Sequence, residues 1–397
     1  MKKIFSILLS VGISTTMLFA QSTNAEGSKY QFKKIVHLDA TPVQSQGQTG
    51  TCWSFSATSF FESEIQRLSP KTPVILSEMY VVRKAYEMKA DKYVRMDGKI
   101  NFGEGGAFHD VPLVISNFGI VPYDVYTGLN GSDKYNHGQL VTELNAVMSD
   151  VLAGLSNPDG INSDWKRKFN SILDYGIGKD VVDFEWNGKK YTPKTYAASL
   201  GLDMNNYVSL TSFTNHPMNS QCMLEIPDNW AWGTSYNVSL DDLVETTISA
   251  LKNGYTIAWG ADVSEKGFSF KNGLAIVPAD PAMIEVVGKD DKRFNDAGAE
   301  RKSNAFLEPM KELAITPELR QKGYDNKTTT DDHGMHIVGL YQDQNGTRYF
   351  LVKNSWGTSN LPKGYLYVSE NYFRYKTINI YLHKDGIPAN VKNKVKW

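Results

Sequence analysis

Cysteine is scarce in this chain, which has two cysteines among 397 residues. Because Cys52 and Cys222 are widely separated, they provide neither a disulfide framework nor the ligand spacing of a cysteine-rich metal site. The C-x-x-C, H-E-x-x-H, P-loop and dinucleotide-binding motifs are absent as well. We therefore expect a protein that uses neither a metal nor a cofactor.

An excess of charge of either sign is also missing. The formal net charge is −1, so nothing in the charge balance favours binding to nucleic acid or to an anionic membrane surface. Hydrophobic residues make up 41% of the chain and aromatic residues 12%, which is enough for a substantial core. The length fits one large or two ordinary domains of a soluble globular protein.

Long hydrophobic runs are confined to the N-terminus, where two lysines precede an apolar run over residues 4–20. This pattern predicts a signal peptide over residues 1–25, with cleavage after Ala20 or after Ala25. Polar residues inside the run disfavour the alternative, a retained membrane anchor, and no later stretch is long and apolar enough to cross a bilayer. We expect an exported bacterial protein, periplasmic or secreted, whose mature chain has no membrane anchor.

One of the two cysteines stands in a chemically distinctive stretch, Gln46-Gly47-Gln48-Thr49-Gly50-Thr51-Cys52-Trp53-Ser54-Phe55. Cys52 follows a glycine-containing loop and begins a segment of helical pattern, and the unpaired N–H groups at a helix N-terminus favour the thiolate. The amide of Gln46 can reach over the cysteine and donate to an oxyanion. The pattern indicates that Cys52 is a catalytic nucleophile. The alternative is a buried structural cysteine, which is our interpretation of Cys222.

Helical patterns dominate the first half of the chain and strand patterns the second. This order indicates an α+β fold with two lobes and a site in the cleft between them. The loop at residues 103–106 contains three glycines, and it either pairs with the backbone of an extended peptide or forms a tight turn. Residues 128–235 carry little obvious chemistry, and the polar residues 280–330 are interpreted as a solvated excursion. Asp331 and Asp332 are interpreted as loop caps rather than as cation ligands.

A cysteine nucleophile needs a base, and the base needs a group that orients it. Among seven histidines, His333 and His336 are the candidates. They lie three positions apart at the entrance to a predicted strand and face opposite ways, so only one of them can line the cleft. A predicted hairpin brings Asn354 beside that strand as the orienting group. Trp356 follows and can shield the hydrogen bond between them from water.

These motifs, in this order, resemble the papain-like cysteine peptidases. The resemblance is carried by Gln46-Gly47 with Cys52-Trp53, by Asp332-His333 with Gly339, and by Lys353-Asn354-Ser355-Trp356-Gly357. It implies that Cys52 is the nucleophile and that Gln46 contributes to the oxyanion hole. It implies further that His333 is the general base and acid, and that Asn354 orients it. Substrate-binding roles follow for Gly105, Gly106 and Trp356, the two glycines by pairing with the substrate backbone.

The resemblance implies a two-lobed papain-like fold, with a helical lobe carrying the nucleophile and a β-rich lobe carrying the histidine and asparagine. Along the sequence, Cys52 and His333 are separated by many more residues than the roughly 130–150 of the papain signature. The excess fits insertions at about residues 128–235 and 280–330, within a peptidase domain over residues 26–397. Phe184-Glu185-Trp186 and Trp259-Gly260-Ala261-Asp262-Val263 resemble landmarks of the bleomycin hydrolase and aminopeptidase C branch.

Members of that branch are aminopeptidases, often hexameric, in which a C-terminal arm leaves room only for a free substrate N-terminus. We therefore expect an aminopeptidase acting on peptides, with a homo-oligomer implied by the resemblance alone. The few residues after Pro388 predict a shortened arm, so an exported endopeptidase with an open cleft is an alternative. A non-catalytic peptide-binding protein on the same scaffold, and an enzyme that transfers the acyl group to an amine, are further alternatives.

Overall fold

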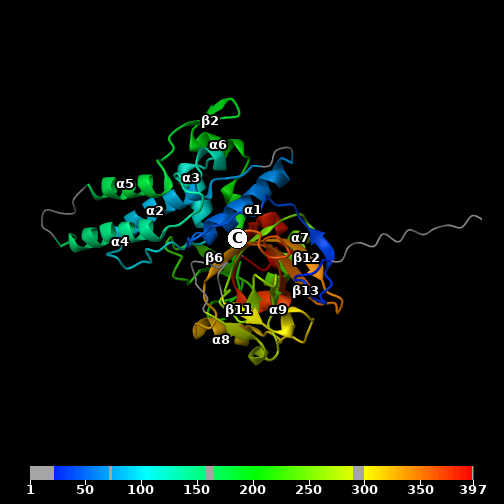
Figure 1. Ribbon diagram of the computed structural model, residues 1–397. Coiled ribbons are helices and arrows are strands. Elements are labelled where there is room, and N and C mark those ends of the chain that lie inside the picture. Colours follow the sequence, from blue (N-terminus) through cyan, green and yellow to red (C-terminus); the bar gives the residue numbers. More distant parts are fainter. Residues whose placement is uncertain (1–21, 71–73, 157–163, 289–298, 396) are drawn as a thin grey trace, which may run out of the picture.

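The structure, a computed structural model, describes residues 22–70, 74–156, 164–288, 299–395 and 397. Residues 1–21 of the predicted signal peptide therefore lie outside the described part. Figure 1 shows a helical lobe beside a β-rich lobe, so the predicted two-lobed α+β architecture is confirmed. Among the described residues, no helix combines the length and the apolar character needed to span a membrane.

The central element is the helix α1 (Cys52–Leu68), which contacts the helix α2 and the strand β12 and so joins the two lobes. Every residue from Trp53 to Ile65 is buried, so this part of the helix has no solvent-facing side. Some of its buried hydroxyl groups bond within the helix, as Thr58 Oγ1 does to Ser54 O at 2.8 Å, and others bond to neighbouring elements, as Ser54 Oγ does to Glu78 O at 2.9 Å. Cys52, its first residue, is thereby fixed at the boundary between the lobes.

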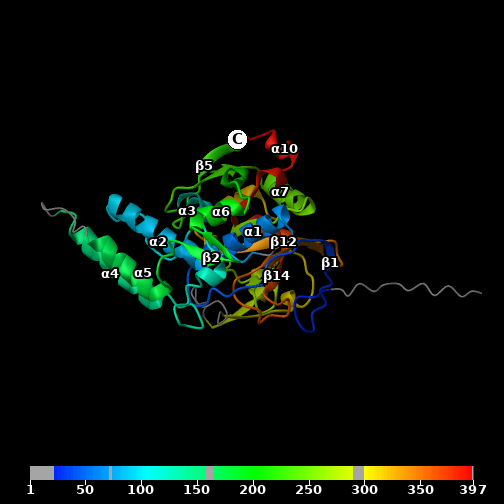
Figure 2. The ribbon, with the colours of Figure 1, turned by 90° about the horizontal axis from the view of Figure 1, so that it is seen from above.

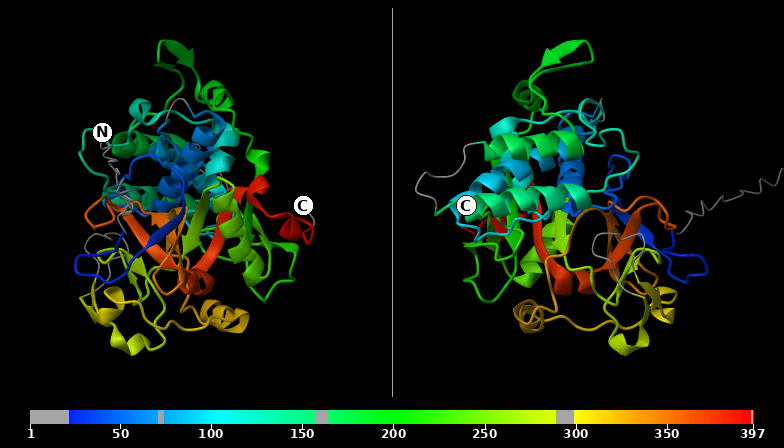
Figure 3. Two further views of the ribbon diagram at one scale, coloured as in Figure 1. Left: turned by 90° about the vertical axis from the view of Figure 1, so that its right-hand side faces the viewer. Right: turned by 60° about the vertical axis from the view of Figure 1, so that its left-hand side comes forward.

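The helical lobe packs α2 against the pair α4 and α5, which lie side by side in Figure 3. A hairpin projects from this lobe, and its turn residues Asn187 and Gly188 have φ of 50° and 74°, as a type I′ turn requires. The elements of this lobe are α2 (Glu78–Arg95), α3 (Asp110–Phe118), α4 (Gly138–Ala153), α5 (Trp165–Ile177), β2 (Phe184–Trp186), β3 (Lys189–Tyr191) and α6 (Pro193–Ser199).

The β-rich lobe is built on a mixed sheet that has eleven strands among the described residues. In spatial order these are β5 (Ser220–Met223), β6 (Thr234–Asn237), β4 (Tyr207–Thr211), β15 (Thr377–His383), β7 (Ile257–Ala261), β12 (His333–Gln342), β13 (Arg348–Lys353), β14 (Tyr365–Ser369), β9 (Leu274–Ala275) and β8 (Phe268–Ser269), with β1 (Lys33–His37) also paired to β12. The predicted hairpin is formed by β12 and β13, with His336 opposite Lys353. This register brings the residues after β13 beside the start of β12.

The remaining elements surround the sheet, and Figure 2 shows the short C-terminal helix α10 near α7. They are α7 (Leu240–Lys252), β10 (Glu285–Val287), β11 (Glu300–Lys302), α8 (Pro317–Asp325), α9 (Glu370–Lys376) and α10 (Ala389–Lys392). Interpreting residues 280–330 as a solvated excursion was wrong for α8. The buried Arg320 of this helix donates to Ser212 O at 2.7 Å and thereby ties it to the sheet.

Candidate active site

His333 and Asn354 meet where β12 begins and β13 ends. His333 Nε2 and Asn354 Oδ1 are 2.7 Å apart, and both side chains are buried. The backbone N–H of Ser355 donates to the same Oδ1 at 2.8 Å, which identifies this atom as the amide oxygen. Nε2 of His333 therefore carries the proton in the neutral ring. The lone pair of Nδ1 is left to accept a proton from the other side.

His336 points away from this site, as the strand alternation requires. Its Nδ1 lies 2.9 Å from Ser59 Oγ of α1, and Lys353 Nζ donates to the same hydroxyl oxygen at 2.7 Å. His336 is fully buried between the sheet and α1. Its contacts are therefore those of a residue that holds the two lobes together.

Cys52 opens into a small cavity of about 140 Å³ whose lining includes Gln46, Gly105, Gly106 and His333. Its Sγ accepts a hydrogen bond from the backbone N–H of Gly334 at 3.4 Å. As the first residue of α1, Cys52 has a backbone N–H with no partner inside the helix. The structure thus brings five of the seven predicted site residues around one space, with Asn354 directly behind His333.

Burial opposes the charged forms of both Cys52 and His333. It raises the pKa of the Cys52 thiol to about 12, and the charges of Asp331 and Asp228 raise it further. The backbone N–H groups of Gly334 and Trp53 act in the opposite direction, the second as expected at a helix N-terminus. Burial also lowers the pKa of His333 to about 4.

The side chain of Gln46 is held at both ends. Its Nε2 donates to Thr49 O at 2.7 Å, and its Oε1 accepts from Ser355 Oγ at 2.7 Å. An amide nitrogen has two N–H groups, so one remains after the bond to Thr49. Because Gln46 lines the cavity beside Cys52, this N–H is available to an atom bound there.

The glycine loop at residues 103–106 forms a wall of the cavity and is fixed by side chains. Lys89 Nζ donates to Gly103 O at 2.8 Å and to Gly105 O at 2.5 Å. Trp53 Nε1 donates to Glu104 O at 3.0 Å. Neither the N–H nor the C=O of Gly106 has a hydrogen-bond partner within the described residues. These two groups are placed to pair with the backbone of a bound peptide.

Trp356 covers the imidazole of His333, with ring centroids 4.6 Å apart and an interplanar angle of 35°. It also lines a second space of about 870 Å³, on the far side of His333 from the glycine loop. Its hydrophobic ring thus both shields the hydrogen bond from His333 to Asn354 and forms part of a larger groove.

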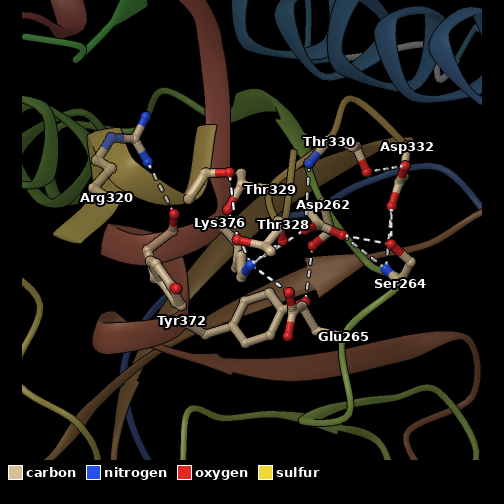
Figure 4. Close-up of polar contacts among 12 residues, drawn as sticks. Asp262, Ser264, Glu265, Arg320, Thr328, Thr329, Thr330, Asp332, Tyr372 and Lys376 are labelled. Atoms are coloured by element: carbon tan, nitrogen blue, oxygen red, sulfur yellow. Dashed lines mark hydrogen bonds and ion pairs between the residues drawn. The ribbon is translucent and has the colours of Figure 1, made fainter. Parts of the chain in front are cut away.

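Asp332, directly before His333, belongs to a hydrogen-bonded network shown in Figure 4. Ser264 Oγ lies 2.6 Å from Asp332 Oδ2 and 2.9 Å from Asp262 Oδ1, so its one proton is shared between the two carboxyl groups. Lys376 Nζ lies 3.3 Å from Asp262 Oδ2, and Thr330 Oγ1 donates to Asp332 Oδ1 at 2.7 Å. Asp332 therefore accepts hydrogen bonds from the neighbouring loops, which is the loop-capping role predicted from the sequence. These bonds hold in place the backbone that carries His333.

Two acidic residues of the cavity were not identified as site residues from the sequence. Asp228 lies in residues 128–235, which seemed to carry little chemistry, and Asp331 was interpreted as a loop cap. Both line the cavity together with Cys52, as does Ile226. No local motif marks Asp228, since its loop reaches the site through tertiary packing. The adjacent pair Asp331-Asp332 is visible in the sequence, but nothing in the sequence shows that these residues line the cavity.

Comparison with known proteins agrees with this geometry. The family described as papain family cysteine protease matches residues 29–91 and 318–382, which include Cys52 and His333. Aminopeptidase W of Lactobacillus delbrueckii subsp. lactis is 22% identical over 91% of this chain and 85% of its own length. Aminopeptidase C of Lactococcus lactis subsp. cremoris is 23% identical over 88% of this chain and 82% of its own.

The fold is also that of a solved structure. The crystal structure of PepW from Lactobacillus rhamnosis HN001 superimposes with a TM-score of 0.67 at 19% sequence identity. The similarity covers 91% of this chain and 84% of that chain. The similarity to PepW thus extends over nearly the whole chain, whereas the papain family match is confined to residues 29–91 and 318–382.

Proposed function

We propose that this papain-like chain, a relative of the bacterial aminopeptidases C and W, is a cysteine-dependent aminopeptidase. The observation that carries the proposal is the arrangement of Cys52, His333 and Asn354, with Gln46 beside the sulfur. A nucleophile, a base, an orienting amide and an oxyanion donor around one cavity are the parts that acyl transfer requires. A non-catalytic binding protein would need no such set.

In the first step, Cys52 attacks the carbonyl carbon of the peptide bond. The thiol proton passes to Nδ1 of His333, whose Nε2 is bonded to Asn354, and the sulfur forms the bond to carbon. The Nε2 proton stays on the bond to Asn354, which holds the ring in place. The tetrahedral oxyanion accepts from the free N–H of Gln46 and from the backbone N–H of Cys52.

In the second step, the imidazolium of His333 donates its proton to the leaving amine, and the carbon–nitrogen bond breaks. His333 then takes a proton from a water molecule, whose oxygen attacks the acyl-enzyme and releases Cys52. The imidazole ring beneath Trp356 faces the larger groove, so the leaving peptide lies on that side.

The two spaces beside the catalytic site differ in volume, and this difference favours an exopeptidase over the alternative, an endopeptidase. The acyl side is the small cavity of about 140 Å³, whereas the leaving side is the groove of about 870 Å³. The smaller space on the acyl side favours a short acyl segment, and the larger groove accommodates the rest of the peptide.

The test is hydrolysis of alanyl-aminomethylcoumarin under reducing conditions. The wild-type protein releases the fluorophore, whereas Cys52→Ala is inactive with an unchanged thermal unfolding temperature. Cys222→Ser is the matched control, since it removes the other thiol, and it keeps wild-type activity. Turnover by Cys52→Ala would refute the assignment of the nucleophile. Added amines that appear in the products by mass analysis would instead identify acyl transfer.

We also propose that the protein is exported, on the strength of its N-terminal sequence, and that cleavage follows Ala20. Asn24 is fully buried and donates to Asn272 O at 2.8 Å and to Phe306 O at 2.9 Å. Cleavage after Ala25 would remove these contacts. N-terminal sequencing of the protein from the natural host tests this, with Gln21 expected first. Self-association is proposed from the resemblance alone, and light scattering of the mature protein tests it.

A further inference from the structure

Part of the cavity wall is formed by the loop at residues 224–233, which carries Asp228 against the glycine loop. The contact is very close, because a Cβ atom added to Gly105 would lie 1.8 Å from Asp228 Oδ2. The other carboxylate oxygen, Oδ1, accepts from Asn101 Nδ2 at 2.6 Å. Asp228 thus stands at the place where a longer peptide would have to extend past Gly105.

Hydrogen bonds within the loop and to α3 hold the segment that carries Asp228 in place. Asn229 Nδ2 donates to Leu224 O at 2.7 Å and to Gly233 O at 2.8 Å, and Asn229 Oδ1 accepts from Gly233 N at 2.7 Å. The indole of Trp230 donates to Asp110 Oδ2 at 2.7 Å, which ties the loop to the start of α3. Asp228 is therefore positioned before any substrate binds.

Asp331 lines the cavity from the β-rich lobe. Its neighbours are anchored, as Figure 4 shows for Thr330 and Asp332. The Asp331 carboxylate itself has no hydrogen bond or ion pair to any part of the chain that the structure describes. Asp228 likewise has no ion pair within that part. Three carboxylates therefore line the cavity that contains the nucleophile. Asp332 accepts from Ser264 and Thr330, whereas Asp228 and Asp331 have no ion pair within the described residues.

An unpaired carboxylate in such a place is unfavourable. Burial raises the pKa of both carboxyl groups, and the charge of Asp228 raises that of Asp331 further. The nearest cation acting on Asp228 is Lys89, which is committed to the carbonyl groups of the glycine loop. A cation that enters with the substrate would satisfy both carboxylates.

Resting on the proposed function, we infer that Asp228 and Asp331 together bind the free α-ammonium group of the substrate and thereby restrict cleavage to the N-terminal end of a peptide. The side chain of a lysine or arginine would supply a similar cation. The small volume of the cavity favours the α-ammonium, because a long side chain needs more room than about 140 Å³ beside the substrate backbone.

The experiment compares alanyl-, acetyl-alanyl- and acetyl-lysyl-aminomethylcoumarin with the full-length mature enzyme. Wild type is expected to cleave the acetylated alanyl substrate at least about 100-fold less efficiently than the free one. Asp228→Asn and Asp331→Asn each lower kcat/KM for the free substrate by about 10- to 100-fold, mainly through KM. The deciding quantity is the ratio of kcat/KM for the free over the acetylated alanyl substrate, which is expected to fall in both variants.

Glu225→Gln is the matched control, because Glu225 lies in the same loop but pairs with His216 outside the cavity. It is expected to behave as wild type. Thermal unfolding excludes a folding defect in the two aspartate variants. Equal cleavage of free and acetylated substrates by wild type would overturn the inference while the peptidase function stands. Preference for acetyl-lysyl substrate would overturn it too, by showing that the cavity binds a side chain.

Binding measured without turnover separates this inference from the proposed function. Calorimetry of Cys52→Ala is carried out with alaninamide and with acetyl-alaninamide. Binding of the free amide alone, and its loss in the Cys52→Ala, Asp228→Asn double variant, supports amine recognition even if the wild type hydrolyses no substrate. Equal binding of both amides, or binding of neither, refutes it.

Discussion

Ser355 Oγ donates to Gln46 Oε1 at 2.7 Å, and Gln46 N donates to Ser355 O at 2.9 Å. Gln46 belongs to the loop before α1, whereas Ser355 directly follows Asn354 after β13. One pair of hydrogen bonds therefore joins the oxyanion donor to the segment that orients His333. A shift of one lobe against the other would disturb both functions at once.

The first prediction concerns this pair. Gln46→Ala removes an oxyanion donor and is expected to lower kcat by ~10²–10³ with little change in KM. Ser355→Ala keeps the Gln46 donor but removes the hydrogen bond to its Oε1, so a smaller fall in kcat, of about tenfold, is expected. Steady-state kinetics on a free alanyl substrate measures both. A full wild-type kcat in Gln46→Ala would show that the oxyanion is held elsewhere.

The second prediction concerns Gly105. Gly105→Ala places a methyl group on the Asp228 carboxylate, which must move away, so the preference for free over acetylated substrate is expected to fall about tenfold. Gly103→Ala is the control in the same loop, since its Cβ would meet only Asn101 Oδ1 at an ordinary 3.5 Å. The ratio of kcat/KM values for the two substrates is the measurement. An unchanged ratio in Gly105→Ala would argue against a role for Asp228.

The third prediction uses the reactivity of the nucleophile. Asp331 raises the pKa of Cys52, so Asp331→Asn increases the thiolate fraction at a given pH. Alkylation by iodoacetamide at pH 8 is expected to become about three- to tenfold faster. The measurement is made in a Cys222→Ser background, so that only one thiol reacts, with Glu225→Gln as the control for loss of a charge. Slower alkylation of Asp331→Asn would contradict the electrostatics described for the cavity.

The fourth prediction concerns stability and Glu312, which accepts from Val277 N at 2.9 Å and from Ser369 Oγ at 2.6 Å. Burial raises the pKa of this carboxyl from 4.5 to about 7. The folded protein therefore keeps the proton at pH values where the unfolded chain has lost it, and the stability from this group falls as pH rises from 4.5 to 7.

Glu312→Gln keeps an oxygen acceptor for both bonds and cannot ionise. Relative to wild type, its free energy of unfolding is expected to rise by up to about 3 kcal/mol between acid and neutral pH. Urea unfolding across that range measures the difference. The exposed Glu285→Gln serves as the control for charge removal. A difference between Glu312→Gln and wild type that does not change with pH would refute the raised pKa.

The sequence was informative where neighbours in space are also neighbours along the chain. The pairing of β12 with β13 follows from local strand and turn signals, and it brings Asn354 to His333. Strand alternation also separates His333 from His336. The helix after Cys52 was predicted from its apolar spacing, although its almost complete burial was not.

Features that depend on distant contacts could not be predicted in this way. Asp228 reaches Gly105 only because Trp230 bonds to Asp110 and the loop folds around Asn229. The burial of Cys52 is a second feature of this kind. A helix N-terminus is a local feature and favours the thiolate, whereas burial depends on both lobes and outweighs it.

The proposed role of Asp228, which lies directly against Gly105, has a consequence for the order in which a polypeptide is degraded. An enzyme that binds the ammonium group would remove one residue in each turnover and release a shortened peptide with a new ammonium group at its N-terminus. That product would be a substrate of the same kind, so a single long peptide would be converted stepwise into free amino acids and a series of shorter chains.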